Sequence, residues 1–405
     1  MNQNKLGSKT KVDLIFFGGL GGLTGASTVI RNILNGFLSS DKVEMRAWAL
    51  DINGKEKYES NHIGEQGTKV DKKISFNSRI LNLLKQLARH SSFFSLILVW
   101  VLYFRFAKKV VGKYQGDGEV LFFHEIFTPF IFKIRRKKQW LNKKKVVVLH
   151  CDGDPLKMLF GYYPMLKKNY MCRQIFNYIL HSIFKDVSKI VLLGENSRKR
   201  FISLYSEYSI KTVVIENGLQ QVKSQTYEKN KNKDKKLKLI TVGTVCERKG
   251  HDLLIDAILL LDEGERKKIE LKIIGDGEIR KCLEKKCEKE ALDNVIFHGS
   301  SKNVSFYLRE SDIFILASRD EGLPMALLEA MQEKLPLIAT NVGDCSDLIV
   351  NNGWLIEPSV NSIAEVIKKA INCEDLIQLG ENSFHLFQEK YTVESMIEKY
   401  DNVLG

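Results

Sequence analysis

The segment DIFILASRDEGLPMALLEAM, residues 312–331, indicates the fold of the second half of the chain. Its apolar start predicts a buried strand, and Gly322 with Pro324 predicts a turn into a helix that has proline near its first turn. Glu321 then lies in the loop and Glu329 lies on the helix, about 7.5 Å of helical rise beyond the proline. Two carboxylates therefore face one crevice beside a helix N-terminus, which attracts phosphate.

Two glutamates at this spacing are also expected on an ordinary solvated helix, so the surrounding segments decide between the two interpretations. The same half of the chain carries LITVGTVCERKGHDLLIDAI (239–258), LKIIGDGEIRKCLEK (271–285), VIFHGSSKNVSFYLRESDIFILAS (295–318) and PLIATNVGDCSDLIVNNGWLIEP (336–358). With the Glu-x7-Glu pair, these segments resemble the successive strand-and-helix blocks of glycosyltransferase family 4, the retaining glycosyltransferases of GT-B fold. The resemblance covers about residues 237–360 closely and the first half more loosely.

The fold class that follows is α/β, with two Rossmann-like domains facing across a cleft. Strands alternate with helices in both halves, a pattern that predicts parallel sheets covered by helices. We expect an N-terminal, acceptor-binding domain over 1–220, a polar linker from Gln220 to Lys236 and a nucleotide-sugar-binding domain over 237–384. The resemblance implies that residues 385–405 form a helix that crosses back to the first domain.

Charge is divided unevenly between the two halves of the chain. Residues 1–220 hold 36 Lys/Arg and 17 Asp/Glu, whereas residues 221–405 hold 26 and 32, so the net charges are +19 and −6. A basic half indicates an anionic partner, either a membrane surface or nucleic acid. The seven cysteines form no CxxC pair and, without a signal peptide, indicate free thiols in a reducing cytosol.

Two segments of the basic half suggest contact with a membrane. The uncharged run SSFFSLILVWVLYF (91–104) is too short to span a bilayer and predicts a buried or interfacial helix. Residues 125–145 mix Phe, Ile and Trp with Lys and Arg, as in a helix that lies among lipid headgroups, or in an ordinary helix with a solvated basic end. We expect the clusters Arg135–Lys138 and Lys143–Lys145 to contact anionic lipid.

The loop GGLGGLTGAS (18–27) follows a strand and opens a helix, so its N–H groups can approach a phosphate. A dinucleotide-binding fold is an alternative, with Asp51 as a ribose acceptor, but Thr24 stands where the third glycine of that motif belongs. In family 4 the equivalent loop contacts the donor diphosphate or the acceptor, which assigns Gly21 and Gly22 to binding.

Several single residues carry further expectations. His150 ends the strand VVVLH at the carboxyl edge of a parallel sheet, and the resemblance places it near the donor sugar and the departing bond. Asp152 and Asp154 match a DxD metal motif weakly, and the GT-B fold does not need a bound metal. Gly275-Asp276-Gly277 predicts a structural turn, and Gly343-Asp344 replaces a double glycine of the family.

Lys249 lies after a strand and just before a helix, where its ammonium can meet the leaving diphosphate. The family usually has an arginine at the position of Thr244, so Arg248 is a candidate replacement. The resemblance implies that Glu321 holds sugar hydroxyls and Glu329 holds the ribose. The amides of the loop are expected to bind phosphate through Gly322, Leu323, Pro324 and Met325.

Together these residues predict a hexosyltransferase that moves a sugar with retention, from a nucleoside diphosphate donor, most simply a UDP-sugar, to a saccharide or lipid-linked saccharide in cell-surface polysaccharide biosynthesis. It needs no cofactor or metal, binds no nucleic acid, and is cytoplasmic and peripheral on the inner face of the cell membrane. A UDP-sugar epimerase of GT-B fold and a non-catalytic polyanion-binding protein are the alternatives.

Overall fold

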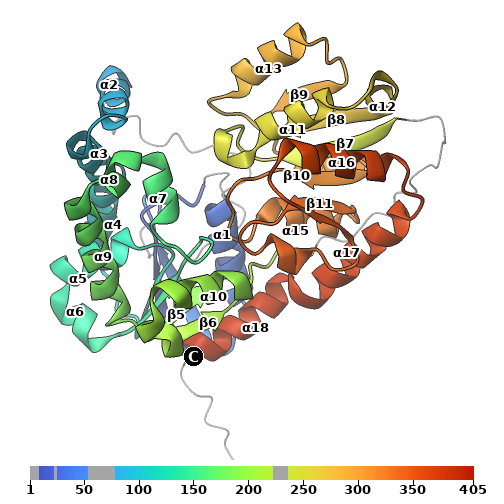
Figure 1. Cartoon of the computed structure of the whole chain (residues 1–405). Helices are drawn as coiled ribbons and strands as arrows, with labels where there is room; N and C mark the ends of the chain where they lie inside the picture. The colour runs from blue at the N-terminus through green and yellow to red at the C-terminus, as the bar shows by residue number, and fades with distance from the viewer. Residues whose placement is uncertain (1–8, 22–24, 53–77, 222–235) are drawn as a thin grey trace, which may run out of the picture. The chain divides into compact units, whose positions relative to one another are not determined.

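A computed structural model describes residues 9–21, 25–52, 78–221 and 236–405 (Figure 1). The chain divides into two compact units. The first comprises Met1–Leu193, Ser197–Ile215 and Met396–Gly405, and the second comprises Gly194–Asn196 and Glu216–Ser395. The predicted linker Gln220–Lys236 lies mostly outside the described residues.

The first unit is built on a parallel sheet in the order β2-β1-β3-β4-β5-β6. Its strands are β1 (Thr10–Ile15), β2 (Val43–Trp48), β3 (Val120–Phe123), β4 (Lys144–Val148), β5 (Lys189–Leu192) and β6 (Thr212–Val214). Strands β3 to β5 are near-continuous apolar runs because helices cover both faces of such a sheet. The two strands whose ends carry histidine, β3 and β4, pair directly with each other.

The helices of the first unit are α1 (Gly25–Phe37), α2 (Ser78–Ala88), α3 (Ser92–Val99), α4 (Arg105–Lys113), α5 (Phe127–Arg135), α6 (Lys137–Asn142), α7 (Lys157–Tyr162), α8 (Pro164–Lys168), α9 (Tyr170–Phe184), α10 (Glu195–Leu204) and η4 (Ser206–Lys211). A π-helical turn, η3 (Trp100–Phe104), joins α3 to α4, so the uncharged segment 91–104 is helical, as the sequence predicts. The basic segment 125–145 instead forms two short helices and the start of β4.

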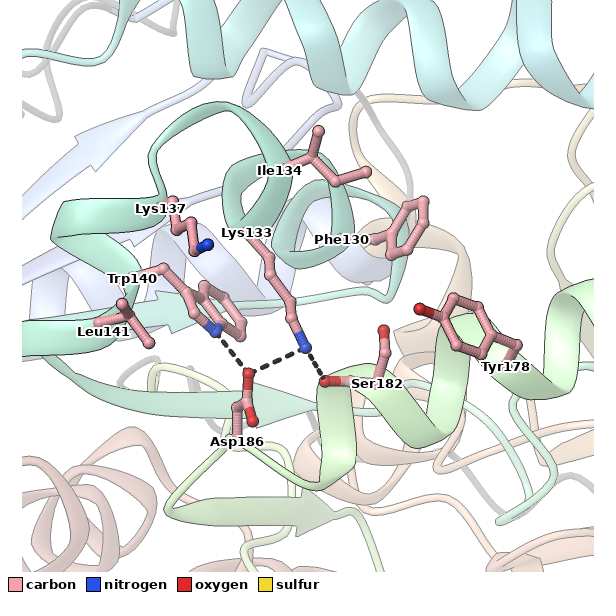
Figure 2. Close-up of a pocket in the computed structure, with 9 residues that line it drawn as sticks. All are labelled: Phe130, Lys133, Ile134, Lys137, Trp140, Leu141, Tyr178, Ser182 and Asp186. Atoms are coloured by element: carbon pink, nitrogen blue, oxygen red, sulfur yellow. Dashed lines mark hydrogen bonds and ion pairs between the residues drawn. The ribbon is translucent and has the colours of Figure 1, made fainter.

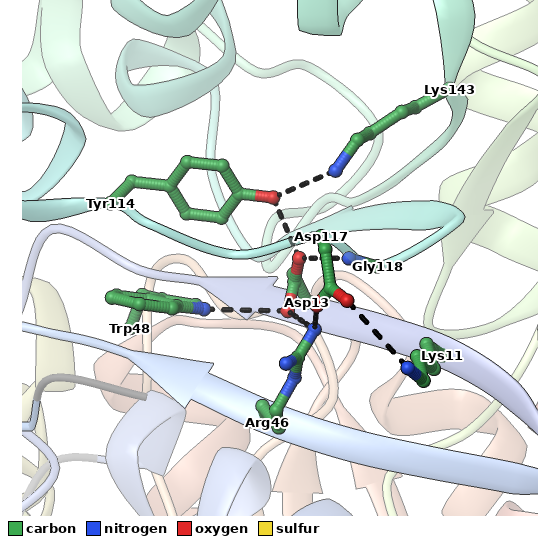
Figure 3. A network of polar contacts seen from close by, with 8 residues as sticks. All are labelled: Lys11, Asp13, Arg46, Trp48, Tyr114, Asp117, Gly118 and Lys143. Atoms are coloured by element: carbon green, nitrogen blue, oxygen red, sulfur yellow. Dashed lines mark hydrogen bonds and ion pairs between the residues drawn. The ribbon is translucent and has the colours of Figure 1, made fainter. Parts of the chain in front are cut away.

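Asp13 of β1 anchors a polar network in the core of the first unit (Figure 3). This fully buried carboxylate accepts hydrogen bonds from the Tyr114 hydroxyl at 2.6 Å and from the Gly118 N–H at 2.8 Å. Arg46 forms an ion pair with it at 3.0 Å. Because a buried charge is tolerated only when it is paired and hydrogen-bonded, the network fixes the turn before β3 against β1 and β2.

The second unit has a parallel sheet in the order β12-β11-β10-β7-β8-β9. Its strands are β7 (Leu237–Val242), β8 (Ile269–Ile274), β9 (Val295–Gly299), β10 (Ile313–Leu316), β11 (Leu337–Thr340) and β12 (Gly353–Ile356). Its helices are η5 (Glu247–Lys249), α11 (His251–Leu259), α12 (Glu263–Lys267), α13 (Arg280–Lys289), α14 (Val304–Arg309), α15 (Met325–Gln332), η6 (Cys345–Leu348), α16 (Val360–Ile371) and α17 (Leu376–Lys390). The prediction of two α/β domains with parallel sheets is confirmed.

The C-terminal helix α18 (Val393–Leu404) belongs largely to the first unit. Tyr400 is buried and its ring lies 5.3 Å from that of Phe122 on β3. Leu404 is fully buried. The end of the chain therefore completes the core of the unit that contains its beginning.

Candidate active site

Glu321 lies in the loop after β10, at the carboxyl edge of the second sheet, and is buried. Its Oε1 accepts hydrogen bonds from Ser318 Oγ at 2.7 Å and from Lys249 Nζ at 2.6 Å. Arg248 approaches Oε2 at 3.2 Å. Burial by itself would raise the pKa of Glu321, but the two cations more than offset it, so that pKa lies below its ordinary value. The glutamate is therefore ionised at neutral pH.

Lys249 and Arg248 come from η5, the short turn between β7 and α11. Gly250 ends that turn with φ +67°, and a Cβ at this position would lie 1.9 Å from the Ala317 carbonyl oxygen. Only glycine therefore lets the lysine-bearing turn approach the end of β10 so closely. The structure thus brings the predicted Lys249 and Glu321 into direct contact.

Arg248 does not project freely toward a ligand. Its guanidinium donates to the Asp320 carbonyl at 2.7 Å as well as approaching Glu321. In the opposite direction, the guanidinium of Arg319 donates to the Glu247 carbonyl at 2.6 Å. The two loops thus hold each other by reciprocal arginine contacts. No pattern in the sequence indicates the role of Arg319, because its partners become neighbours only in the fold.

Glu329 projects from α15 and has a different environment. Its carboxyl group forms no hydrogen bond or ion pair with the described residues. Burial raises its pKa to about 7, and Lys249 offsets part of this rise. A largely enclosed carboxyl group without a protein partner is suited to accept hydrogen bonds from a ligand's hydroxyl groups.

The loop between the two glutamates leads into α15, whose N-cap is Pro324. Proline has no N–H, so it cannot donate to a phosphate as predicted, although Gly322, Leu323 and Met325 retain their donors. Gly343, at φ +56°, packs against this loop, where a Cβ would lie 2.2 Å from the Glu321 carbonyl oxygen. The glycine of the predicted Gly343-Asp344 turn therefore helps to position Glu321.

His150 lies just after β4 in the first unit, where the sequence predicts it. Its Nε2 lies 3.0 Å from Nδ1 of His124, which follows β3, and the two rings stack. Burial lowers the pKa of His150 to about 4. Burial, with a smaller contribution from His150, also lowers the pKa of His124 well below its ordinary value, so both rings are neutral at neutral pH. His124 was missed, although VLFFH and VVVLH both end in histidine and adjacent parallel strands end at the same edge.

The glycine-rich loop is hydrogen-bonded to the side chain of Asp51. The N–H groups of Leu20 and Gly21 each donate to its carboxylate, at 2.9 Å. A negative charge already occupies these donors, which disfavours a phosphate at the Gly21 amide unless Asp51 moves. Gly22 lies outside the described residues. The assignment of both glycines to ligand binding remains a prediction.

The aspartates of the DxD sequence have structural partners. Asp152 is buried and forms ion pairs with Lys157 at 2.5 Å and Arg200 at 3.5 Å, while Asp154 accepts the Leu156 N–H at 3.0 Å. Within the part of the chain that the structure describes, no group of three or more His, Cys, Asp or Glu side chains is placed to hold a metal ion.

The basic clusters predicted to contact lipid are partly engaged inside the first unit. Lys145 is buried and donates to the Trp140 carbonyl at 2.7 Å, because it alternates inward on β4. Arg136 donates to the Tyr114 carbonyl at 3.0 Å, and Lys143 donates to the Tyr114 hydroxyl at 3.1 Å. Among the described helices, none is long and apolar enough to cross a bilayer.

Comparison with known proteins finds a family model that matches part of the chain. Residues 222–384 match the family model described as glycosyl transferases group 1. The segment includes both glutamates and Lys249, so the group 1 match falls on the unit that holds the charged cluster.

Relatives of the group 1 region include two bacterial proteins. An uncharacterized glycosyltransferase of Haemophilus influenzae is 34% identical over 53% of this chain and 61% of its own length. The O-antigen biosynthesis glycosyltransferase WbnH of Escherichia coli is 28% identical over 56% of this chain and 64% of its own. Each match thus covers less than two thirds of the relative.

The fold extends over the whole chain. The crystal structure of Anabaena HepE in complex with UDP has a TM-score of 0.66 and 16% identity, and the match covers 97% of this chain and 99% of HepE. Together with the two parallel six-stranded sheets, this likeness confirms the predicted GT-B class.

Proposed function

We propose that this protein is a retaining glycosyltransferase that moves a hexose from a UDP-sugar to a saccharide or lipid-linked saccharide in cell-surface polysaccharide biosynthesis. The observation that carries the proposal is the ion pair of Lys249 with buried Glu321, close to Glu329, whose carboxyl group has no hydrogen-bond or ion-pair partner among the described residues. The group 1 match, the O-antigen relative and the UDP held by HepE support the donor and the process.

The second unit would bind the donor. Glu329 accepts the ribose hydroxyls, and its ionised form is favoured once those donors are in place. The Lys249 ammonium has three N–H donors and gives one to Glu321, which leaves two for the diphosphate. The N–H groups of Gly322, Leu323 and Met325 add donors beside the N-terminus of α15.

Bond cleavage would then be driven by charge stabilisation at the leaving group. As the bond between the sugar and the phosphate oxygen breaks, Lys249 stabilises the negative charge that develops on the diphosphate. Among the described residues, Glu321 Oε2 accepts a hydrogen bond from Arg248 alone, so it can accept another from a sugar hydroxyl. An acceptor hydroxyl attacking from the leaving-group side forms the new bond with retention and passes its proton to the diphosphate. Neither glutamate forms a bond to the sugar, and the protein's own cations remove the need for a metal.

For the first unit we propose acceptor binding, with neutral His150 offering its ring to a sugar hydroxyl at the carboxyl edge of the sheet. Its partner His124 leaves one ring nitrogen, Nε2, buried without a hydrogen bond. An unsatisfied acceptor costs less than an unsatisfied N–H, so we place the His124 proton on Nδ1, which donates to His150. His150 then carries its own proton on Nδ1 and acts as a donor. The proposed location is cytoplasmic, on the inner face of the cell membrane.

The test is nucleoside diphosphate release from a panel of UDP- and GDP-sugars, with and without membrane extract as the source of acceptor. We expect one UDP-sugar to support release that depends on the extract and that labels a saccharide. Lys249→Ala is the inactive variant, and Lys267→Ala, whose exposed side chain pairs with Glu263, is its matched control. Isomerisation of the donor without any acceptor would identify an epimerase instead, and no turnover with any donor would refute the proposal.

A further inference from the structure

The helices α2 to α9 of the first unit, called here the helix layer, have an unusual charge composition. Residues 78–184 hold 19 Lys/Arg and 5 Asp/Glu, a net charge of +14. The five acidic residues are Asp117, Glu119, Glu125, Asp152 and Asp154, and all five lie between the helices or next to strands. None of the helices of the layer contains an acidic residue, whereas the solvated face of a soluble helix normally mixes both signs.

Three helices of the layer also expose apolar stripes at intervals of three, four or seven residues. The exposed members are Ile80, Leu83 and Leu87 on α2, Phe93 and Trp100 on α3 and η3, and Met171, Ile175 and Tyr178 on α9. Met171 and Tyr178 are 73% and 70% exposed. On α9 the other face buries Cys172, Phe176 and Ile179 in the core. Such helices are apolar on both faces, but the described protein covers only one.

The stripes belong to one connected set of helices, which gathers on one side of the first sheet (Figure 1). Helix α2 packs against α3, α3 against α8, α8 against α9, α9 against α5 and α5 against α6. By contrast, the exposed large apolar residues of the second unit are scattered, at Leu260, Phe306, Val350, Leu355 and Ile377. Exposed apolar stripes on helices that pack against one another indicate an interaction site.

A pocket of about 390 Å³ interrupts the layer between α5, α6 and α9 (Figure 2). Exposed Ile134, Leu141 and Tyr178 belong to its lining. Lys133 is held by Asp186 at 2.9 Å and the Ser182 carbonyl at 2.7 Å, whereas Lys137 is exposed and forms no ion pair with the described residues. An apolar hollow with a cation at its rim fits an acyl chain whose headgroup is anionic.

We infer that the helix layer docks on the surface of an anionic lipid bilayer, with the stripes among the headgroups and upper acyl chains. Aromatic and aliphatic side chains interleaved with lysine and arginine are the composition of interfacial helices. A nucleic acid would use the positive charge but would leave Ile80, Leu83, Met171 and Ile175 in water. The docking surface belongs to the first unit, whereas the charged cluster around Glu321 belongs to the second, so docking can be tested independently of sugar transfer.

The test is flotation of the full chain with vesicles of phosphatidylcholine alone or with 30% phosphatidylglycerol, in low and high salt. We expect strong binding to anionic vesicles that high salt weakens, because each lysine near such a surface raises binding about fivefold. Trp100 is 55% exposed while Trp48 and Trp140 are buried, so tryptophan fluorescence should shift to the blue on binding. Trp100→Phe should abolish most of that shift and retain flotation.

Two sets of substitutions separate the contributions of the apolar side chains and of the basic side chains to vesicle binding. Phe93→Asn/Met171→Gln/Tyr178→Asn removes the most exposed apolar side chains of the stripes on α3 and α9. Lys137→Glu/Lys138→Glu/Lys167→Glu/Lys168→Glu reverses the charge of four lysines. Each set should lower vesicle binding at least tenfold with UDP affinity unchanged. The matched controls are Leu204→Asn/Ile210→Asn, exposed outside the layer, and Lys281→Glu/Lys285→Glu/Lys289→Glu in the second unit. Equal binding to neutral and anionic vesicles, no binding by the wild type, or equal losses from the control sets would overturn the inference.

Discussion

Arg319 holds the carboxylate of Asp252 through two hydrogen bonds, of 2.8 and 2.5 Å. Asp252 lies in the first turn of α11, directly after the turn that carries Lys249, while Arg319 lies two residues before Glu321. The backbone N–H of Arg319 also donates to the Arg248 carbonyl at 2.8 Å. This pair therefore fixes the distance between the loop that supplies the cation and the loop that supplies the carboxylate.

Arg319→Ala is expected to lower kcat about tenfold or more, because a bidentate ion pair that aligns two charged groups contributes on the order of 1 to 3 kcal/mol. Steady-state kinetics and UDP calorimetry provide the measurement. Arg319→Lys should recover only part of the loss, since lysine cannot form both bonds. If the alanine variant keeps full kcat with an altered melting temperature, the pair contributes to stability alone.

Glu329→Gln is expected to weaken UDP binding while raising stability at alkaline pH. The folded-state pKa of Glu329 is raised to about 7, so its contribution to stability is present at low pH and is lost as the pH rises through 7. The amide has no charge to bury, and the variant should melt at a higher temperature than the wild type at pH 8 and at a similar temperature at pH 5.

The same substitution predicts a pH signature in binding. Wild-type affinity for UDP should increase from pH 6 to pH 8 more than that of Glu329→Gln, because the ribose hydroxyls bind the ionised carboxyl group best. Titration of both proteins with the same UDP cancels the ionisation of the nucleotide itself. Identical pH profiles and affinities would show that this carboxyl group does not bind the ribose.

Lys249→Ala is expected to lower kcat on the order of a hundredfold, because it removes a positive group aimed at the developing charge of the leaving diphosphate. Arg248→Ala should lower kcat by a smaller factor, since the guanidinium of Arg248 is hydrogen-bonded to the Asp320 carbonyl and to Glu321. Single-turnover rates with saturating donor give the comparison. A greater loss for Arg248 would place the diphosphate at the arginine and would reassign Lys249 to orienting Glu321.

Asp13→Asn is expected to destabilise the first unit by about 3 kcal/mol, because a buried carboxylate with several donors is replaced by a group that presents an N–H to some of them. Asp117→Asn is the matched control, since Asp117 also pairs with Arg46 but its side chain is 66% exposed. Urea unfolding curves measure both. Equal losses in the free energy of unfolding from the two substitutions would mean that burial of Asp13 contributes nothing to stability.

The sequence predicted the second unit well because its signals are local. The apolar strand, the glycine, the proline and the helix of residues 312–331 fix where Glu321 and Glu329 lie without reference to other segments. Lys249 was found for the same reason, from a strand followed by a turn and a helix. The group 1 match covers residues 222–384, which include this segment and Lys249.

The features that the sequence did not predict depend on contacts between segments that are distant in the chain. A run of lysines does not reveal that Lys145 turns inward on β4, nor does the glycine-rich loop reveal that Asp51 accepts its amides. Proline at position 324 was placed correctly but was given a donor that it does not possess. His124 was the avoidable omission, since its strand and that of His150 end in the same residue.

The return of α18 to the first unit has a consequence for synthesis of the chain. N-terminal domains generally fold first as they leave the ribosome. Here Phe122 can contact Tyr400, and Leu404 can be buried, only after codons 400 and 404 have been translated. All residues of the second unit are synthesised before residues 396–405, which belong to the first unit. Until these residues are synthesised, part of the core of the first unit is exposed. Stop codons between positions 396 and 400 are therefore expected to cause misfolding of the first unit, although every residue of the charged cluster around Glu321 has been made.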